Sequence, residues 1–196
     1  YSSPTTLGNE NLKLEKALTS ELGIKYRKEN FNLNMSLYRR DASDIIDYVR
    51  NNETDPWQAN NIREIRTNGF ELNMSYKFYL ATFLKHRINI GFSNINDDIL
   101  ETNFAFSRYA LNSLKNQVTA TYMFEVNEKI SSTLAYKNAE RTDEEKYTVI
   151  DFTTTYKLEK FTLSIILNNI LDTEYSETNL VPMPGFNTLA GIKYSF

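Results

Sequence analysis

The 196-residue sequence predicts an all-β chain, a large piece of an antiparallel transmembrane β-barrel. Apolar and polar residues alternate with a period of two in nine separate runs, and no credible helix lies between them. Short and long connections follow one another along the chain, which places the long loops at one end of an up-and-down meander. Aromatic residues recur beside the short connections, as in the girdle of a barrel at a membrane interface.

Each predicted strand has an apolar side and a polar side, because the side chains of a strand point alternately to its two faces. In the third run, for example, Leu72 and Met74 face away from Asn73 and Ser75. The nine runs cover residues 18–26, 31–37, 70–78, 84–92, 117–126, 130–136, 150–158, 161–167 and 187–196.

The ninth run ends the chain on an aromatic residue. Ala190, Ile192, Tyr194 and Phe196 share one of its faces. Such a strand would be an exposed and adhesive edge in a soluble sheet, whereas it suits a barrel that closes within a membrane.

The connections after the first, third, fifth and seventh runs are short, and the others are mostly long and polar. The short ones are residues 28–30, 79–83, 127–129 and 159–160, and the long ones are residues 43–61, 96–114, 141–146 and 172–185. Outer-membrane barrels have short periplasmic turns and long extracellular loops, whereas soluble sandwiches usually mix connection lengths at both ends. The pattern therefore favours the membrane barrel.

Alternation alone does not determine which side of a strand faces the inside of the fold. In a soluble barrel the apolar sides meet in a core, whereas in a membrane barrel they face lipid and the polar sides line the lumen. The aromatic residues near the strand ends favour the membrane arrangement. In that arrangement the inward-facing polar residues are Lys25, Asn32, Asn34, Glu71, Asn73, Lys85, Arg87, Gln117, Asp151 and Lys193.

Composition excludes several other classes of protein. The absence of Cys excludes a disulfide framework and thiolate metal sites, and the net charge of −3 without basic clusters gives no indication of nucleic-acid binding. No apolar run approaches the roughly 20 residues of a membrane helix. The start of the chain shows no signal peptide, and bacterial single-chain barrels have even strand numbers. We therefore expect residues 1–196 to be the C-terminal portion of a longer protein.

Several segments, in order, carry a resemblance to a known family. Residues 8–16 and 20–26 (GNENLKLEK and SELGIKY) are followed by residues 37–41 (LYRRD), 60–62 (NNI) and 67–72 (TNGFEL). Residues 167–175 (LNNILDTEY) precede a Pro-Gly pair and a Tyr-Ser-Phe ending. This series resembles the TonB-dependent outer-membrane receptors, although Leu14 stands where Pro is usual, Phe70 where Val is commoner and Phe186 where Arg is frequent.

The resemblance implies a barrel of about 22 strands around an N-terminal plug. This chain would supply the last nine strands, with the plug and the earlier strands outside it. The family imports a scarce ligand across the bacterial outer membrane with energy from the TonB complex, contacted through a segment outside this chain. Residues 46–49 and 57–60 look most like cobalamin-type receptors, although siderophore receptors share the barrel. Further implied partners are the plug, the barrel-assembly machinery, outer-membrane lipids and a surface lipoprotein.

The two longest predicted loops hold the candidate ligand-binding residues. Trp57 is the only Trp, and an aromatic side chain with polar neighbours at the outer mouth can stack on a ligand and orient it. The alternative is that these residues pack within their own loops or lie at the membrane interface. The predicted contacts are Trp57, Tyr48, Asn60, Arg63, Arg108 and Tyr109.

The sequence gives little support for a metal site or a catalytic site. The acidic run of residues 143–145 matches no calcium loop and is expected to be a solvated loop. His86 is the only His and falls on the apolar side of its strand near a short turn, which indicates an interfacial residue. One His and no Cys support neither a Ser-His-Asp site nor a His-based metal site, so we expect no enzyme and no cofactor.

The C-terminal pair Tyr194 and Phe196 resembles the signal that the barrel-assembly machinery recognises in this family. Simple anchoring at the membrane interface is a compatible role. Two rival functions remain at this point. One is a passive porin-like outer-membrane barrel, and the other is a soluble β-sheet binding protein.

Overall fold

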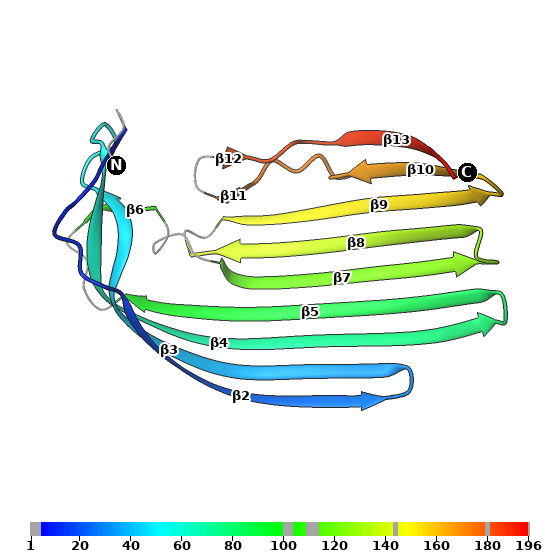
Figure 1. Cartoon of the computed structure of the whole chain (residues 1–196), viewed down its shortest axis with the longest axis horizontal. Helices are drawn as coiled ribbons and strands as arrows, with labels where there is room; N and C mark the ends of the chain where they lie inside the picture. Colours follow the sequence, from blue (N-terminus) through cyan, green and yellow to red (C-terminus); the bar gives the residue numbers. More distant parts are fainter. Residues whose placement is uncertain (1–4, 100–103, 109–113, 143–144, 179–180, 196) are drawn as a thin grey trace.

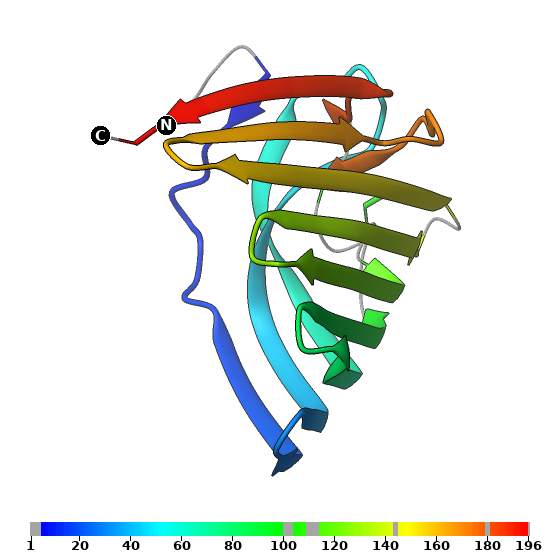
Figure 2. The same ribbon diagram turned by 90° about the vertical axis from the view of Figure 1, so that its right-hand side faces the viewer.

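The computed structural model describes residues 5–99, 104–108, 114–142, 145–178 and 181–195. Nine long strands lie side by side in one antiparallel sheet, in the order β2-β3-β4-β5-β7-β8-β9-β10-β13 (Figure 1). All nine predicted strands are therefore confirmed. The sheet is strongly curved in cross-section, with β2 at one edge and β13 at the other (Figure 2). The chain forms a section of barrel wall.

The strands of the wall differ greatly in length. They are β2 (Lys16–Lys28), β3 (Phe31–Arg50), β4 (Trp57–Ala81), β5 (Leu84–Ile99), β7 (Leu114–Val126), β8 (Ile130–Arg141), β9 (Lys146–Leu158), β10 (Phe161–Asn168) and β13 (Asn187–Tyr194). Four short strands lie at the long-loop end: β1 (Thr6–Leu7), β6 (Phe106–Ser107), β11 (Ser176–Thr178) and β12 (Val181–Pro182). The part of the chain that the structure describes contains no helix that could cross a membrane.

The predicted short connections are tight turns that all lie at one end of the sheet (Figure 1). Glu29, Asn127, Glu128 and Glu159 in these turns have φ between 40° and 56°, a left-handed conformation that non-Gly residues adopt only in sharp turns. The long connections lie at the opposite end. The up-and-down meander expected from the sequence is therefore confirmed.

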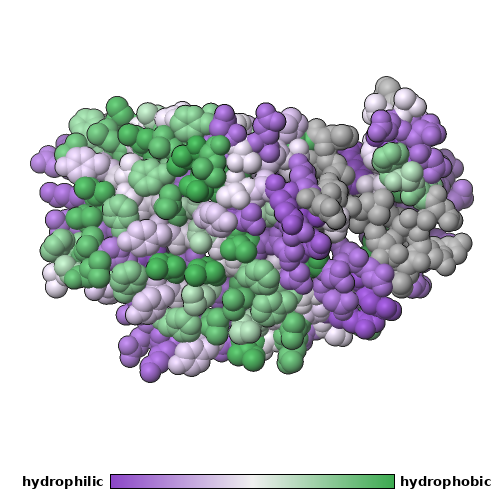
Figure 3. All heavy atoms as spheres, turned by 180° about the vertical axis from the view of Figure 1, so that it is seen from behind, coloured by the Kyte–Doolittle hydropathy of each residue, from purple (hydrophilic) through white to green (hydrophobic). Residues whose placement is uncertain are grey.

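The strand register places the apolar sides on one face of the sheet. Ile24, Met35, Leu72, Phe92 and Val118 form one row across five neighbouring strands. One residue along each strand, the opposite face carries Lys25, Asn34, Asn73, Gly91 and Thr119 as a polar row. Figure 3 shows the convex face, where apolar side chains gather over the half nearer the short turns.

This face exposes so many large apolar side chains that contact with water would be unfavourable. Leu22 is 73% exposed and Ile192 is 75% exposed, at opposite ends of the curved sheet. Burial of each such side chain is worth about 1.5–3 kcal/mol, and in a single-layer sheet only lipid can supply that burial. The convex face is therefore the membrane face, and the concave polar face lines the lumen.

Aromatic rings gather on the convex face next to the short turns. Phe78, His86 and Tyr122 stack in sequence, with ring centroids 4.8 Å and 5.7 Å apart. The Nδ1 atom of His86 lies 2.7 Å from the Tyr122 hydroxyl. Farther along the same end, the Phe161 and Tyr194 rings are 5.0 Å apart. This arrangement matches the predicted aromatic girdle, and His86 lies within it as expected.

The polar rim of the convex face begins where the apolar band ends. Beyond Leu37 and Phe70, Asp41 accepts hydrogen bonds from Arg39 at 2.8 Å and from Arg66 at 2.9 Å. These two guanidinium groups lower the pKa of the Asp41 carboxyl to about 2. Asp41 thus stays ionised at the long-loop rim of the membrane face over the whole neutral range.

The largest departure from expectation is the connection between β3 and β4. Residues 43–61 were expected to form a long loop, but β3 runs to Arg50 and β4 starts at Trp57, so only residues 51–56 connect them. Regular antiparallel pairing continues to the pair Val49–Gln58. The polar content of this segment suggested a loop, whereas pairing between the two strands satisfies their backbone groups out in solvent.

Candidate functional site

The outer parts of β3 and β4 form a two-stranded hairpin that bends across the long-loop end of the sheet (Figure 1). The last pair between β2 and β3 is Lys16–Ser43, and the next residue, Asp44, has a φ of 54°. The side-chain amide of Asn61 donates a hydrogen bond to the Asp44 carbonyl. The bend therefore lies where β3 loses its neighbour β2.

The chain before β2 supports one side of this hairpin. β1 pairs in parallel with the start of β4, and the Trp57 amide donates to the Thr5 carbonyl at 2.9 Å. The Asn9 side chain donates to the Ala59 carbonyl at 3.1 Å. At the bend, the Ile46 amide donates to the Glu15 carboxylate at 2.7 Å. These contacts cover backbone groups that the sheet no longer pairs.

A segment of the second long loop supports the other side. β6 pairs with the end of β3, and the Arg108 amide donates to the Tyr48 carbonyl at 3.0 Å. Beneath this contact the Asp47 carboxylate is buried, accepting a hydrogen bond from the Tyr48 amide at 2.6 Å and another from the Ser107 hydroxyl. Charge-assisted bonds to a buried carboxylate are strong, so they fix the second loop to the hairpin.

A cationic and aromatic cluster lies near the tip of the hairpin. The Arg50 guanidinium carbon is 4.4 Å from the centre of the Trp57 ring and 5.5 Å from that of Phe106. The Arg108 guanidinium carbon is 6.0 Å from the Trp57 ring. Arg50 also donates to the Glu53 carbonyl. We call Arg50, Trp57, Phe106 and Arg108 the hairpin cluster.

The structure brings together several of the residues predicted to bind ligand. Trp57 and Arg108 belong to the hairpin cluster, and the Tyr48 backbone contacts Arg108. Asn60 lies opposite Asp47 in the pairing of the two strands and accepts a hydrogen bond from Asn9 at 3.3 Å. Tyr48, Trp57 and Asn60 lie on strands and not in a loop, which corrects the expectation, whereas Arg108 directly follows β6.

Two of the residues predicted to bind ligand are not seen among these contacts. Arg63 lies within β4, near the bend and away from the tip. Tyr109 lies outside the described residues. At the other end of the chain, Tyr194 is on β13 within the aromatic girdle, whereas Phe196 lies outside the described residues.

A second cluster on the concave face was not anticipated from the sequence. The Lys137 ammonium group pairs with the Glu177 carboxylate, and Arg141 donates to the Glu177 carbonyl. The Tyr147 and Tyr175 rings stack at 4.6 Å. We call these five residues the lumenal cluster. Burial, reinforced by the Glu177 carboxylate, raises the pKa of the Tyr175 phenol, so this phenol remains a hydrogen-bond donor.

A compact hydrogen-bonded segment holds the lumenal cluster in place. Asn169 is 2% exposed, and its side-chain amide donates to the carbonyls of Thr173 at 2.9 Å and Pro184 at 3.2 Å. Its side-chain oxygen accepts from the Thr173 amide at 3.0 Å, and its own amide donates to Asp151 at 2.7 Å. This segment returns the chain from β10 to Tyr175 above the lumen.

The chemistry of the two clusters suits recognition of a ligand and not its conversion. Guanidinium groups bind carboxylates and phosphates in a fixed planar geometry, and aromatic rings provide flat apolar surfaces. Within the described ranges, no three acidic or histidine side chains are grouped so that they could hold a metal ion. Asp143 and Glu144, in the predicted acidic loop, lie outside those ranges, whereas nearby Glu140 binds Lys115 and Lys146 at 3.3 Å and 3.5 Å.

The second cluster was missed because it depends on contacts between distant parts of the chain. Lys137 and Tyr147 both fall on the polar sides of their strands, which was a usable signal. Glu177 is 40 residues from Lys137 in sequence, and only the folded segment after β10 brings them together. No local sequence pattern indicates that the segment after β10 folds back toward Lys137.

Comparison with known proteins agrees with this architecture. Residues 1–170 match the family described as "TonB dependent receptor-like, beta-barrel". The vitamin B12 transporter BtuB of Vibrio vulnificus is 24% identical over 178 residues, which cover 86% of this chain and 27% of that protein. The chain therefore spans about a quarter of the length of this relative.

Solved structures show the same fold at low identity. The copper transporter OprC superposes with a TM-score of 0.72 at 16% identity, over 95% of this chain and 32% of that one. The siderophore receptor PirA of Acinetobacter baumannii gives a TM-score of 0.72 at 17% identity, over 97% and 33%. For the FrpB iron transporter of Neisseria meningitidis the TM-score is 0.70 at 18% identity, over 97% and 33%.

The family match covers most of the sequence, and its barrel architecture agrees with a wall whose convex face is apolar and whose concave face is polar. The chain belongs to the TonB-dependent receptor-like β-barrel family, whose members are bacterial outer-membrane receptors and transporters and not enzymes.

Proposed function

We propose that the whole protein imports a scarce ligand across the outer membrane with energy supplied by TonB. The observation that carries this proposal is the family match over residues 1–170. In this proposal the chain supplies the last nine strands of a barrel of about 22, and an N-terminal plug and a TonB-contacting segment lie in parts of the protein outside residues 1–196.

The ligand belongs, in this proposal, to the cobalamin or siderophore class. The curated relative is named for vitamin B12, and solved relatives are named for copper, iron and siderophores. The hairpin cluster and the lumenal cluster supply cationic and aromatic groups suited to an anionic or aromatic ligand.

Import is differential binding followed by a conformational step. The ligand binds at the outer mouth, and energy from TonB then rearranges the plug, which the barrel wall frames. The predicted contacts Tyr48, Asn60, Arg63 and Tyr109 complete the ligand-binding mouth in this proposal. The barrel-assembly machinery, outer-membrane lipids and a surface lipoprotein remain predicted partners.

The test is uptake by the full-length receptor in isogenic cells with and without TonB. Radiolabelled cyanocobalamin and ferric siderophores are supplied at nanomolar concentration, and cell-associated label is measured over time. We expect accumulation of one cargo only in cells that contain TonB. Equal accumulation without TonB would indicate a passive porin-like pore and would contradict the proposal.

A further inference from the structure

Lys137 is a residue of the wall whose charge the neighbouring strands do not neutralise. Its partners in the strand register are Thr119 on β7 and Val149 on β9, and neither of them is an acid. Asp151, two residues after Val149, accepts a backbone amide of the segment after β10 at 2.7 Å. The carboxylate that binds the Lys137 ammonium group belongs instead to Glu177, 40 residues later in the sequence.

Two other lysines at the long-loop end of the wall are paired differently. Lys115 on β7 and Lys146 on β9 both bind Glu140 of β8, at 3.3 Å and 3.5 Å. Those ion pairs join neighbouring strands, so they follow from the strand register alone. The pair between Lys137 and Glu177 depends on how the chain folds back after β10.

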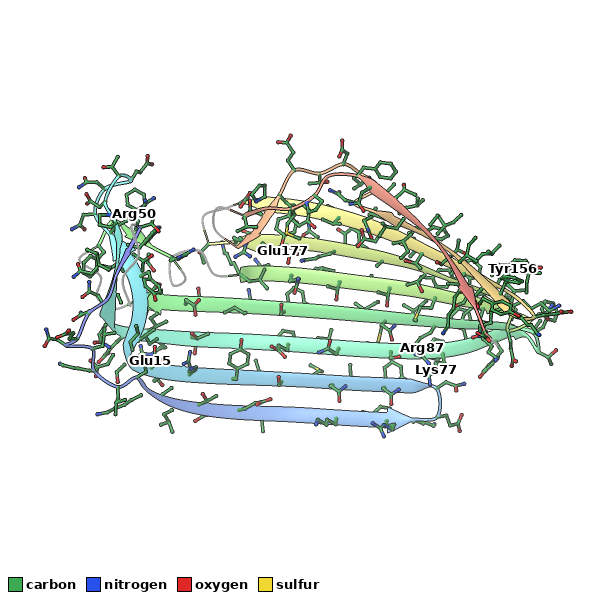
Figure 4. All side chains as sticks on the ribbon, turned by 45° about the horizontal axis from the view of Figure 1, so that its top comes forward. Glu15, Arg50, Lys77, Arg87, Tyr156 and Glu177 are labelled. Atoms are coloured by element: carbon green, nitrogen blue, oxygen red, sulfur yellow. The ribbon has the colours of Figure 1, made fainter. Side chains whose placement is uncertain are left out.

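Glu177 lies on a small sheet that is not part of the wall. Its strand, β11, pairs with β12 in a separate two-stranded sheet, and Figure 4 shows Glu177 at the long-loop end, over the ends of the wall strands. The Glu177 carbonyl accepts a hydrogen bond from Arg141. The Glu177 side chain is 40% exposed and that of Lys137 is 29% exposed. A solute in the lumen can therefore reach this ion pair.

An ion pair with this exposure holds its partners weakly. Partly exposed pairs shift an equilibrium by no more than about fivefold, because water competes for both charges. A solute that brings its own carboxylate and further contacts can therefore replace the Glu177 carboxylate at Lys137.

The further contact is available at Tyr175, whose ring is only partly buried. This phenol lies near both charges of the ion pair. Burial raises its pKa most, the Glu177 carboxylate raises it further, and the Lys137 ammonium group lowers it. An aromatic ring offers a flat surface on which the ring of a ligand can stack. The site thus combines a cation with an aromatic surface.

We propose that Glu177 is a built-in competitor of the ligand, whose carboxylate occupies the position at Lys137 that a carboxylate of an aromatic ligand takes on binding. This inference rests on the proposed function for a ligand that enters the lumen, and it names the chemical class and the residue that selects it. An anionic ligand exchanges one ion pair for another. A neutral aromatic solute leaves Lys137 bound to Glu177 and gains only the contact with Tyr175.

The experiment measures the binding of radiolabelled phthalate, an aromatic dicarboxylate, to the purified full-length receptor by equilibrium dialysis. Phthalamide, the neutral diamide of the same shape, is the control probe. Glu177→Gln and Lys137→Gln each remove one charge of the pair, and Lys137→Arg keeps the charge. Glu174→Gln and Lys146→Gln are the matched controls, with the same charge changes at exposed positions nearby. Heat-modifiable migration on gels verifies that each barrel is assembled.

We expect Glu177→Gln to tighten phthalate binding by about fivefold, the most that a partly exposed ion pair contributes. Lys137→Gln should weaken it by about tenfold, the factor for roughly one charge-assisted hydrogen bond, and Lys137→Arg should keep most of the affinity. The two control variants should change it by less than about twofold. Binding of phthalamide should be the same in all variants.

The opposite signs of the two changes distinguish a competitor from an ion pair that only supports the fold. If the pair only held β11 and β12 in place, loss of either charge would loosen the same segment, and both variants would weaken binding. Any result other than opposite changes in affinity would overturn the proposal. That includes weakening in both variants, no change in both, and no saturable binding of phthalate to the wild-type receptor.

The outcome is independent of the import test, because dialysis uses purified protein without TonB. Uptake that does not need TonB would contradict the import proposal alone. Uptake that needs TonB, without opposite changes in phthalate affinity, would contradict the role of Glu177 alone.

Discussion

Among the glycines of the wall, Gly69 has the least room for an added side chain. A Cβ atom added there would lie 2.1 Å from the ring of Tyr38, which is paired with it on the neighbouring strand. Tyr38 therefore lies flat over the glycine on the lumenal face. Gly23, on β2, differs: a Cβ atom there would lie no closer than 3.4 Å to the Met35 carbonyl oxygen.

We predict that Gly69→Ala destabilises the barrel by about 1–3 kcal/mol, because the Tyr38 ring must move away from its packed position. Gly23→Ala serves as the control, with a much smaller effect. The measurement is the urea midpoint for loss of heat-modifiable migration in the full-length protein. Equal midpoints for the two variants would show that the Tyr38 ring has room to move.

Trp57 is the residue on which the ligand-binding prediction depends. One of its neighbours, Arg50, lies 4.4 Å from the ring, so the indole supports a guanidinium group as well as offering surface. The sequence alternative, in which Trp57 packs within its own segment, and the ligand-binding role are compatible in this geometry. In the proposed site, the indole would orient Arg50 toward a ligand through this cation–π contact.

Trp57→Ala is therefore expected to weaken binding of the transported cargo by about tenfold while leaving the barrel assembled. Trp57→Phe, which keeps an aromatic face, should retain most of the affinity. Equilibrium binding of labelled cargo to the purified receptor is the measurement. An unchanged affinity in Trp57→Ala would remove Trp57 from the predicted site.

Among the elements, the return segment after β10 contributes most to the shape of the mouth. Asn169 has a φ of 49° and makes four hydrogen bonds through its side chain and amide. Asn tolerates this left-handed conformation better than most residues. The segment 167–175 carried part of the family resemblance in the sequence. The hydrogen bonds between Asn169 and Thr173 give a physical reason for the spacing of these two residues.

We expect Asn169→Ala to reduce stability by about 2–4 kcal/mol, since it removes three side-chain hydrogen bonds to the backbone of Thr173 and Pro184 and places Ala at a positive φ. Asn168→Ala is the neighbouring control, because its side chain makes one hydrogen bond, to Asn187 at 2.9 Å. Urea unfolding of the two variants compares them directly. Similar losses of stability in the two variants would mean that the hydrogen bonds of Asn169 together contribute no more than the single bond of Asn168.

At the scale of the whole molecule, the strands were predictable and the mouth was not. Alternation in runs such as residues 70–78 depends only on neighbours in sequence, and it identified all nine strands. The mouth depends on pairings between segments that are far apart, such as β1 with β4 and β6 with β3. Strands of two residues carry no periodic signal, so local patterns could not reveal them.

The same limit explains the outcome for the predicted site residues. The structure places Trp57, Tyr48 and Arg108 together at the long-loop end of the barrel, and their role in ligand binding stays a prediction. Arg50 and Glu177 were not anticipated, since their contacts come from the bend of the hairpin and the return after β10. Recognition by the assembly machinery through Tyr194 and Phe196 stays a prediction.

The wall is one layer thick, and this constrains how such a sequence can change over evolutionary time. Deleting one residue within β5 would shift every later residue of that strand to the other face, placing Arg87-type side chains in lipid and Ile88-type side chains in the lumen. Deleting two would preserve the facing. Changes in the interior of a strand therefore preserve the facing only in even steps, unless a bulge absorbs the extra residue, as between Tyr79 and Ala81.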